Sequence, residues 1–116
     1  MSWRWLLAAA LTVSSLSAAD VKTPPWETSR LVIGRDLFRD NCAVCHDIDK
    51  DKMHSRKLGP SLNHLFKNAR MPLSHAKPNR QYVEIRIKFG GALMPAFGKR
   101  LDDSEINTLI DYLASK

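Results

Sequence analysis

The chain has 116 residues, only two cysteines, and a formal net charge of +6 from 18 basic and 12 acidic residues. Two cysteines exclude a fold held together by several disulfides, and a chain this short forms one small domain whose own hydrophobic core is marginal. The basic residues are scattered with few aromatic residues among them, which argues against nucleic acid as a partner. The charge instead indicates docking on acidic protein surfaces or anionic lipid, or it serves solubility alone.

Residues 1–19 have the pattern of a secretory signal peptide. Arg4 supplies the positive n-region, residues 5–13 form an apolar h-region, and Ser17-Ala18-Ala19 is a small-residue cleavage site. The apolar stretch is much shorter than the roughly 20 residues that a spanning helix needs, so we expect cleavage rather than a membrane anchor. The sequence therefore predicts export to the periplasm, with no stable membrane insertion after cleavage.

A leader precedes the folded domain. Residues 20–28 contain Pro24-Pro25 and little apolar pattern, which predicts an extended segment without regular structure. We expect a single domain over residues 29–116.

The first helix is predicted to start at a capping Ser29 and to run through Asp40. Gly34, Phe38 and Cys42 then lie four residues apart on one helical face. A glycine inside a helix costs about 1 kcal/mol relative to alanine. Gly34 therefore indicates that another backbone approaches closely at this point.

The run Cys42-Ala43-Val44-Cys45-His46 follows this helix directly. In a Cys-x-x-Cys-His motif, two thiols can add across the vinyl groups of a haem, and the adjacent imidazole can bind the iron. A bare Cys-x-x-Cys also occurs in thiol oxidoreductases and zinc half-sites, which remain the alternatives. The motif predicts one covalent haem c with its iron, attached to Cys42 and Cys45, with His46 as an iron ligand. Haem attachment also belongs outside the reducing cytosol, in agreement with the signal peptide.

Two further stretches have sequence patterns that indicate their secondary structure less clearly. The residues between His46 and Leu58 are charged and lack periodicity, which indicates a solvated loop. Residues 82–89 satisfy both the alternation of a strand and the spacing of a helix. No other stretch offers a strand partner, and a lone strand cannot satisfy its backbone hydrogen bonds, so we predict a helix that ends at Gly90-Gly91.

The last segment predicts an amphipathic helix that begins with a capping box of Asp102 and Glu105. Its apolar residues follow the i, i+3, i+4, i+7 pattern: Ile106, Leu109, Ile110 and Leu113. The two terminal helices are expected to cross, with Gly34 and Phe38 against Leu109 and Tyr112.

A haem iron held by one histidine needs a second axial ligand if it is to carry electrons without binding small molecules. The candidates are Met53, Met71, Met94, His54, His64 and His75. Met94 lies between flanking glycines just before the last helix, and Pro95 stiffens its backbone. A neutral thioether favours ferrous iron and raises the reduction potential. Met94 is therefore the predicted ligand, with Met71, a histidine or an open site as the alternatives.

Three motifs together resemble the class I cytochromes c, a family of monohaem c-type cytochromes. They are Cys42-Ala43-Val44-Cys45-His46, Gly59-Pro60-Ser61-Leu62 and Met94-Pro95-Ala96-Phe97, in that order, and the likeness covers nearly all of residues 29–116. The resemblance implies an all-α cytochrome c fold whose terminal helices cross and whose helices and loops wrap around one covalently bound haem. It also implies that His46 and Met94 bind the iron from opposite faces, and that the Pro60 carbonyl accepts a hydrogen bond from the His46 ring.

The function predicted on this basis is a periplasmic one-electron carrier between a donor dehydrogenase or reductase and a terminal acceptor, rather than an enzyme. Redox proteins with acidic docking surfaces are the expected partners, and the chain is expected to be a monomer or a subunit of a redox complex. The alternatives are a tightly bound cytochrome subunit of a larger dehydrogenase, or a haem enzyme or gas sensor with an open sixth position. Lys67 or Arg70 is considered as the neutralising partner of a haem propionate, with plain surface charge as the competing interpretation.

Overall fold

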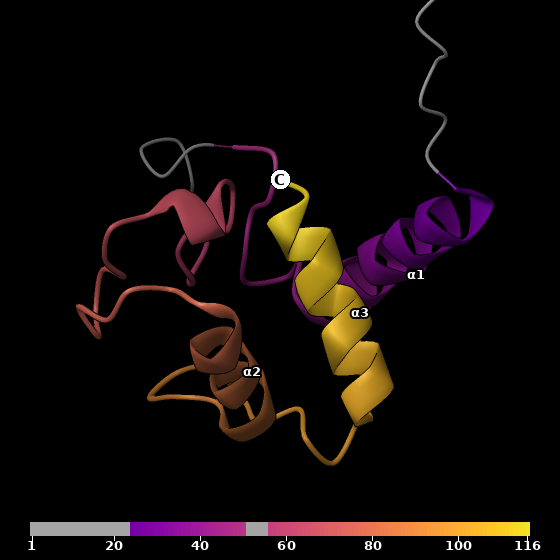
Figure 1. Ribbon diagram of the computed structural model, residues 1–116. Helices are drawn as coiled ribbons and strands as arrows, with labels where there is room; N and C mark the ends of the chain where they lie inside the picture. The colour runs from indigo at the N-terminus through magenta and orange to yellow at the C-terminus, as the bar shows by residue number, and fades with distance from the viewer. Residues whose placement is uncertain (1–23, 51–55) are drawn as a thin grey trace, which may run out of the picture.

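The computed structural model describes residues 24–50 and 56–116 (Figure 1). Its elements are the helices α1 (Pro25–Asn41), α2 (Arg80–Phe89) and α3 (Asp103–Ala114), and the short 3₁₀ turn η1 (Leu65–Lys67). No strand occurs within the described ranges, and the all-α prediction is confirmed. The predicted signal peptide and residues 20–23 lie outside the described residues. Among the helices of the described part, none is both long and apolar enough to cross a bilayer.

Helix α1 begins earlier than the sequence pattern predicts. It starts at Pro25 rather than at Ser29, so residues 25–28 of the expected extended leader are helical. Proline is well suited to the first helical position, where its missing N–H has no intrahelical partner anyway. Ser29 lies one turn into the helix, and its hydroxyl donates to the Pro25 carbonyl at 2.9 Å instead of capping the N-terminus.

The predicted crossing of the terminal helices is present, and α3 passes over α1 at Gly34 (Figure 1). A Cβ atom at Gly34 would lie 2.5 Å from Tyr112 Cβ and 2.7 Å from the Thr108 carbonyl oxygen, so only glycine permits this approach. One turn further along α1, the Phe38 and Tyr112 rings pack with their centroids 6.0 Å apart. Ile106, Leu109 and Ile110 on α3 are fully buried behind this contact.

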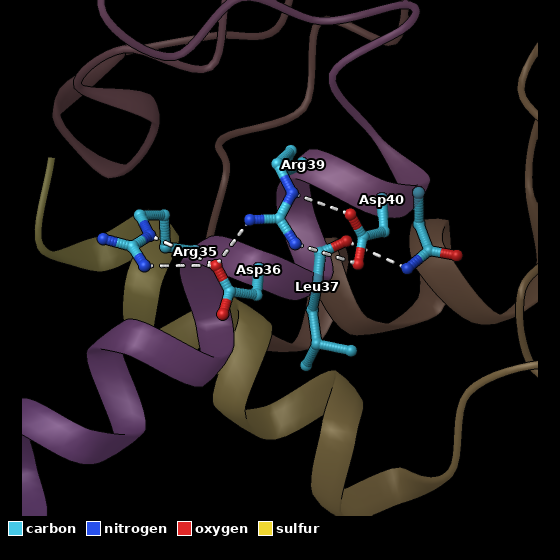
Figure 2. Close-up of polar contacts among 6 residues, drawn as sticks. Arg35, Asp36, Leu37, Arg39 and Asp40 are labelled. Carbon is cyan, nitrogen blue, oxygen red and sulfur yellow. Dashed lines mark hydrogen bonds and ion pairs between the residues drawn. The ribbon is translucent and has the colours of Figure 1, made fainter.

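The exposed face of α1 carries ion pairs between neighbouring arginines and aspartates (Figure 2). Arg39 contacts Asp36 at 3.0 Å and Asp40 at 2.8 Å, and Figure 2 shows its guanidinium between the two carboxylates. The hydrogen bond to Asp40 and the charges of both aspartates raise the pKa of Arg39. Exposed pairs of this kind contribute little to stability. This face of α1 is solvated, and the opposite face supplies the core.

Helix α2 confirms the choice of helix over strand for residues 82–89. The Asn79 side chain accepts a hydrogen bond from the Tyr82 N–H and caps the N-terminus, while Gly90 ends the helix with a φ of 73°. Lys88 joins α2 to the start of α3, with its ammonium 2.8 Å from both Glu84 and Asp103. The capping box of Asp102 and Glu105 predicted for α3 is also present.

The segment after the Cys-x-x-Cys-His motif is predicted as a solvated loop, but part of it is buried. Ile48 is only 7% exposed and belongs to the core. The Asp47 carbonyl accepts a hydrogen bond from the Leu62 N–H at 2.8 Å, which ties this segment to the chain near η1. Residues 51–55 of the same loop lie outside the described residues.

Candidate cofactor site

A cavity of about 600 Å³ lies between α2, α3 and the loops that precede and follow α2. Its size is typical of a site that encloses an organic cofactor. The wall is mainly apolar, with Leu62, Leu65, Val83 and Ile87 among its side chains. All five residues predicted for the site line this one cavity: Cys42, Cys45, His46, Pro60 and Met94.

The Cys-x-x-Cys-His motif forms a turn at the C-terminus of α1. The Cys42 N–H donates to the Phe38 carbonyl at 2.8 Å, and the N–H groups of Cys45 and His46 both return to the Cys42 carbonyl, at 3.1 and 2.9 Å. These hydrogen bonds satisfy carbonyls that a helix end leaves without partners. The turn holds two thiols and an imidazole on a rigid helix end at the cavity.

The His46 ring is oriented by the backbone of the Gly59-Pro60 segment. His46 is 9% exposed, and its Nδ1 lies 2.8 Å from the Pro60 carbonyl oxygen. Because a carbonyl can only accept, Nδ1 carries a hydrogen and donates a hydrogen bond to the Pro60 carbonyl. In the neutral imidazole, Nε2 then carries no hydrogen and can act as a metal ligand.

Gly59 is required for this arrangement. A Cβ atom at Gly59 would lie 2.6 Å from His46 Nδ1 and 2.8 Å from the Cys45 carbonyl oxygen. The Gly59 N–H also donates to that carbonyl at 2.7 Å. The glycine therefore lets the Pro60 carbonyl approach the imidazole.

We expect Gly59→Ala to lower the free energy of unfolding of the holoprotein by about 1–3 kcal/mol, the usual cost of inserting a methyl group into a packed site. Guanidinium denaturation followed by absorbance would measure this loss. Lys99→Ala, at an exposed position outside the cavity wall, serves as the control and should stay within about 0.5 kcal/mol of wild type. Equal stability of Gly59→Ala and wild type would show that the His46 ring does not need this contact.

Lys57 was missed by the sequence analysis because it lies in a charged stretch that predicts only a solvated loop. Its ammonium donates to the Ala43 carbonyl, lies 3.4 Å from the His46 carbonyl, and pairs with the Asp47 carboxylate at 3.2 Å. Lys57 therefore stabilises the backbone of the motif, and the Asp47 carboxylate balances its charge.

Met94 reaches the cavity on a loop that folds back onto α2. The Gly91 N–H donates to the Met94 carbonyl at 2.9 Å, and the Phe97 N–H donates to the Ile87 carbonyl at 2.9 Å. A Cβ atom at Gly90 would lie 2.9 Å from the carbonyl carbon of Pro95, so the turn depends on that glycine as well as on its positive φ. These contacts hold the Met94 thioether, which is half-buried, at the cavity wall.

The other candidate iron ligands are placed less favourably, with one exception. His64 and His75 are exposed and do not line the cavity. Met71 does line it, so two thioethers face the same space. Met53 and His54 lie outside the described residues.

The environment of Cys42 is the opposite of that expected for the reactive thiol of an oxidoreductase. Burial raises the pKa of Cys42 to about 11, and the neighbouring Cys45 adds to the shift. Reactive cysteines of the Cys-x-x-Cys class instead have a lowered pKa, because the thiolate is the nucleophile. Cys42 therefore lacks the lowered pKa on which thiol exchange in this class depends.

The cationic residues at the cavity differ from those considered in the sequence analysis. Lys67 and Arg70 are exposed and do not line it, whereas Lys57 and Arg86 do. Arg86 follows Tyr82 by four residues on α2, so both side chains lie on the same face of the helix. That spacing was the available sequence signal for a polar pair at the site.

The residues of the cavity fit a haem. The wall is apolar enough for a porphyrin ring, two thiols stand at its edge, and an oriented imidazole and a thioether can supply the two axial ligands. No other common cofactor uses this combination of covalent and metal-binding groups.

Comparison with known proteins gives the same result. Residues 29–113 match the family model described as "Cytochrome C oxidase, cbb3-type, subunit III". Cytochrome c6 of Diacronema lutheri is 32% identical over 83 residues, which are 72% of this chain and 92% of that protein. Cytochrome c6 of Bryopsis maxima is 29% identical over 83 residues, 72% of this chain and 88% of that one. The crystal structure of the c-type cytochrome SorU from Sinorhizobium meliloti superposes with a TM-score of 0.53 at 26% identity, covering 76% of this chain and 91% of that one.

Proposed function

Because this chain is a monohaem class I c-type cytochrome that carries covalent haem c and its iron, we propose that it is a one-electron carrier with His46 and Met94 as the iron ligands. Haem c supplies the chemistry, a one-electron change between ferrous and ferric iron. Cys42 and Cys45 would hold the cofactor through two thioether bonds, each formed by addition of an S–H bond across a vinyl group. The remaining residues of the cavity bury the ring and exclude water.

The observation that carries this proposal is the presence of His46 and Met94 in the wall of the same cavity. With His46 and Met94 as ligands, a haem iron would have no open position for a substrate. This arrangement supports a carrier over a haem enzyme or gas sensor. It also supports a raised reduction potential, because a neutral sulfur ligand favours the ferrous state.

The proposal also covers the compartment and the partners of the protein. The signal-like pattern of residues 1–19 and the need of haem attachment for an oxidising compartment favour export to the periplasm. The net charge of +6 favours partners with acidic docking surfaces. A subunit of a larger redox complex is the second candidate, since the matching family model is described as an oxidase subunit.

The carrier function predicts two properties of the purified holoprotein. The ferrous form should not bind carbon monoxide on mixing, because its sixth position is filled. Its oxidation by ferricyanide, an anionic oxidant, should slow by roughly threefold or more between about 10 and 200 mM salt, since salt screens the attraction of a basic surface.

Stopped-flow absorbance would follow both reactions, and a cationic cobalt complex serves as the control oxidant. The rate with the cobalt complex should rise with salt, because like charges are screened. Rapid carbon monoxide binding would show an open sixth position, and the protein would then be a haem enzyme or gas sensor rather than a carrier. A salt-independent rate with ferricyanide would remove the argument for acidic partners.

A further inference from the structure

One corner of the largely apolar cavity is polar. Ser74, Tyr82 and Arg86 all line it and are joined by hydrogen bonds. The Ser74 and Tyr82 hydroxyls lie 2.7 Å apart, and Arg86 Nη2 donates to the Tyr82 hydroxyl at 3.4 Å. The Arg86 guanidinium also lies over the Tyr82 ring, 5.5 Å from its centroid. The three side chains form one connected group, which we term the polar corner.

The guanidinium of Arg86 is held in place by the loop that carries Met94. Arg86 Nη1 donates to the Gly90 carbonyl at 3.2 Å. Gly91 packs directly beneath it, and a Cβ atom there would collide with Nη1 and lie 3.4 Å from Cζ. Because Gly91 has no side chain, it leaves room for the Arg86 guanidinium. The hydrogen bond to Gly90 then holds the guanidinium at the cavity wall.

This cation has no anionic partner in the part of the chain that the structure describes. Among residues 24–50 and 56–116, no carboxylate lies within ion-pairing distance of Arg86, although the residue is half-buried. Lys57, the other cation of the cavity wall, is already paired with Asp47. A guanidinium has five N–H donors, and the two hydrogen bonds of Arg86 leave several of them without partners. Removing a charge from water without an opposite charge is costly, so the polar corner has the chemistry of an anion site.

We propose that Arg86 is the counter-ion of a propionate carboxylate of haem c, with the Ser74 and Tyr82 hydroxyls available as further donors. This inference rests on the proposed function, because it assumes that haem c fills the cavity. The charged groups at the edge of haem are its two propionates, so its apolar part matches the apolar wall and a carboxylate matches the polar corner. A planar guanidinium can donate two parallel hydrogen bonds to a carboxylate, which favours Arg86 over a lysine.

The pairing has a consequence for the iron. A fixed positive charge beside the haem disfavours the additional positive charge of the ferric state. Arg86→Gln should therefore lower the reduction potential while Met94 stays bound. Arg100→Gln removes the same charge at an exposed position outside the cavity wall and should change the potential less.

Resonance Raman spectroscopy of the ferrous holoprotein tests the pairing, because the propionate bending mode reports hydrogen bonding to the carboxylate. We expect this mode to shift in Arg86→Gln, to shift less in Arg86→Lys, and to remain at its wild-type position in Arg100→Gln. The sulfur-to-iron charge-transfer band of the ferric protein should persist in Arg86→Gln. An unshifted propionate mode in Arg86→Gln would overturn the proposal while leaving the haem and its axial ligands intact.

A second measurement uses the wild-type protein and does not depend on how the variants fold. Nuclear Overhauser contacts in the diamagnetic ferrous state should connect propionate methylene protons with the Arg86 side chain. Contacts of both propionates with Lys57 and none with Arg86 would overturn the proposal. Absence of covalent haem from the preparation would instead refute the proposed function, so the two failures are distinguishable.

Discussion

Replacing Met94 with alanine is expected to lower the reduction potential by roughly 0.1–0.3 V, a fraction of the about 0.8 V range over which axial ligands set haem potentials. The ferric holoprotein should also lose its weak red charge-transfer band, which arises from sulfur bound to ferric haem. The physical reason is the loss of a neutral, soft ligand that favours ferrous iron. Potentiometric titration and absorbance spectroscopy would measure both effects, and the ferrous variant should bind carbon monoxide.

Met71→Ala is the matched control, because Met71 carries the same thioether and lines the same cavity. It should leave the red band in place. If Met71→Ala lost the band and Met94→Ala kept it, the ligand assignment would be reversed. If neither variant changed the spectrum, sulfur ligation itself would be wrong.

The double variant Cys42→Ala/Cys45→Ala is expected to lack covalent haem and to lose most of its folded structure. Without haem, the apolar wall of the cavity of about 600 Å³ is left without the group that it packs against and is exposed to water. The total stability of a domain is only about 5–15 kcal/mol, so the loss of this packing should unfold most of the chain. Haem staining of a denaturing gel and far-ultraviolet circular dichroism would measure attachment and helix content.

Val44→Ala is the control within the motif, because the Val44 side chain is 82% exposed and lies between the two cysteines. It should keep both the haem stain and the helical spectrum. A double cysteine variant that still stained for haem after denaturation would contradict attachment through Cys42 and Cys45. A fully helical variant without haem would show that the cofactor is not part of the core.

Local patterns predicted the helices well where each helix has its own sequence signal. The capping box of Asp102 and Glu105 fixes the start of α3, and Gly34 indicates the close crossing with α1. The helix over residues 82–89 was predicted by a fold-level argument, since its periodicity alone fits a strand equally well. The start of α1 was predicted wrongly because Ser29 can cap a helix in principle, whereas Pro25 at the first helical position decides it.

The position of Ile48 could not be predicted from its neighbours. It stands among charged residues, yet it belongs to the core, and the adjacent Asp47 carbonyl accepts a hydrogen bond from Leu62, which is not a sequence neighbour. The 3₁₀ turn η1 likewise has no periodic signal, because its length is a single turn.

The residues of the site also differ in how well the sequence predicts their roles. The attachment motif and the Met-Pro loop are contiguous in sequence, so their chemistry can be predicted from residue types and spacing. Lys57 acts through carbonyls of the motif, which folding brings to it, so its role leaves no local pattern. The partners of Arg86, Tyr82 and the Gly90 carbonyl, are each four residues away. Their spacing is a local signal, but it does not indicate that the pair faces a cavity.

We propose above that the iron of the covalent haem is bound by both His46 and Met94. X-ray absorption at the iron edge tests it most directly, because sulfur and nitrogen ligands scatter at different distances and phases. We expect a sulfur scatterer in the first coordination shell of the wild-type and Met71→Ala holoproteins, and its loss in Met94→Ala. A first shell of nitrogen and oxygen alone in the wild-type protein would contradict it.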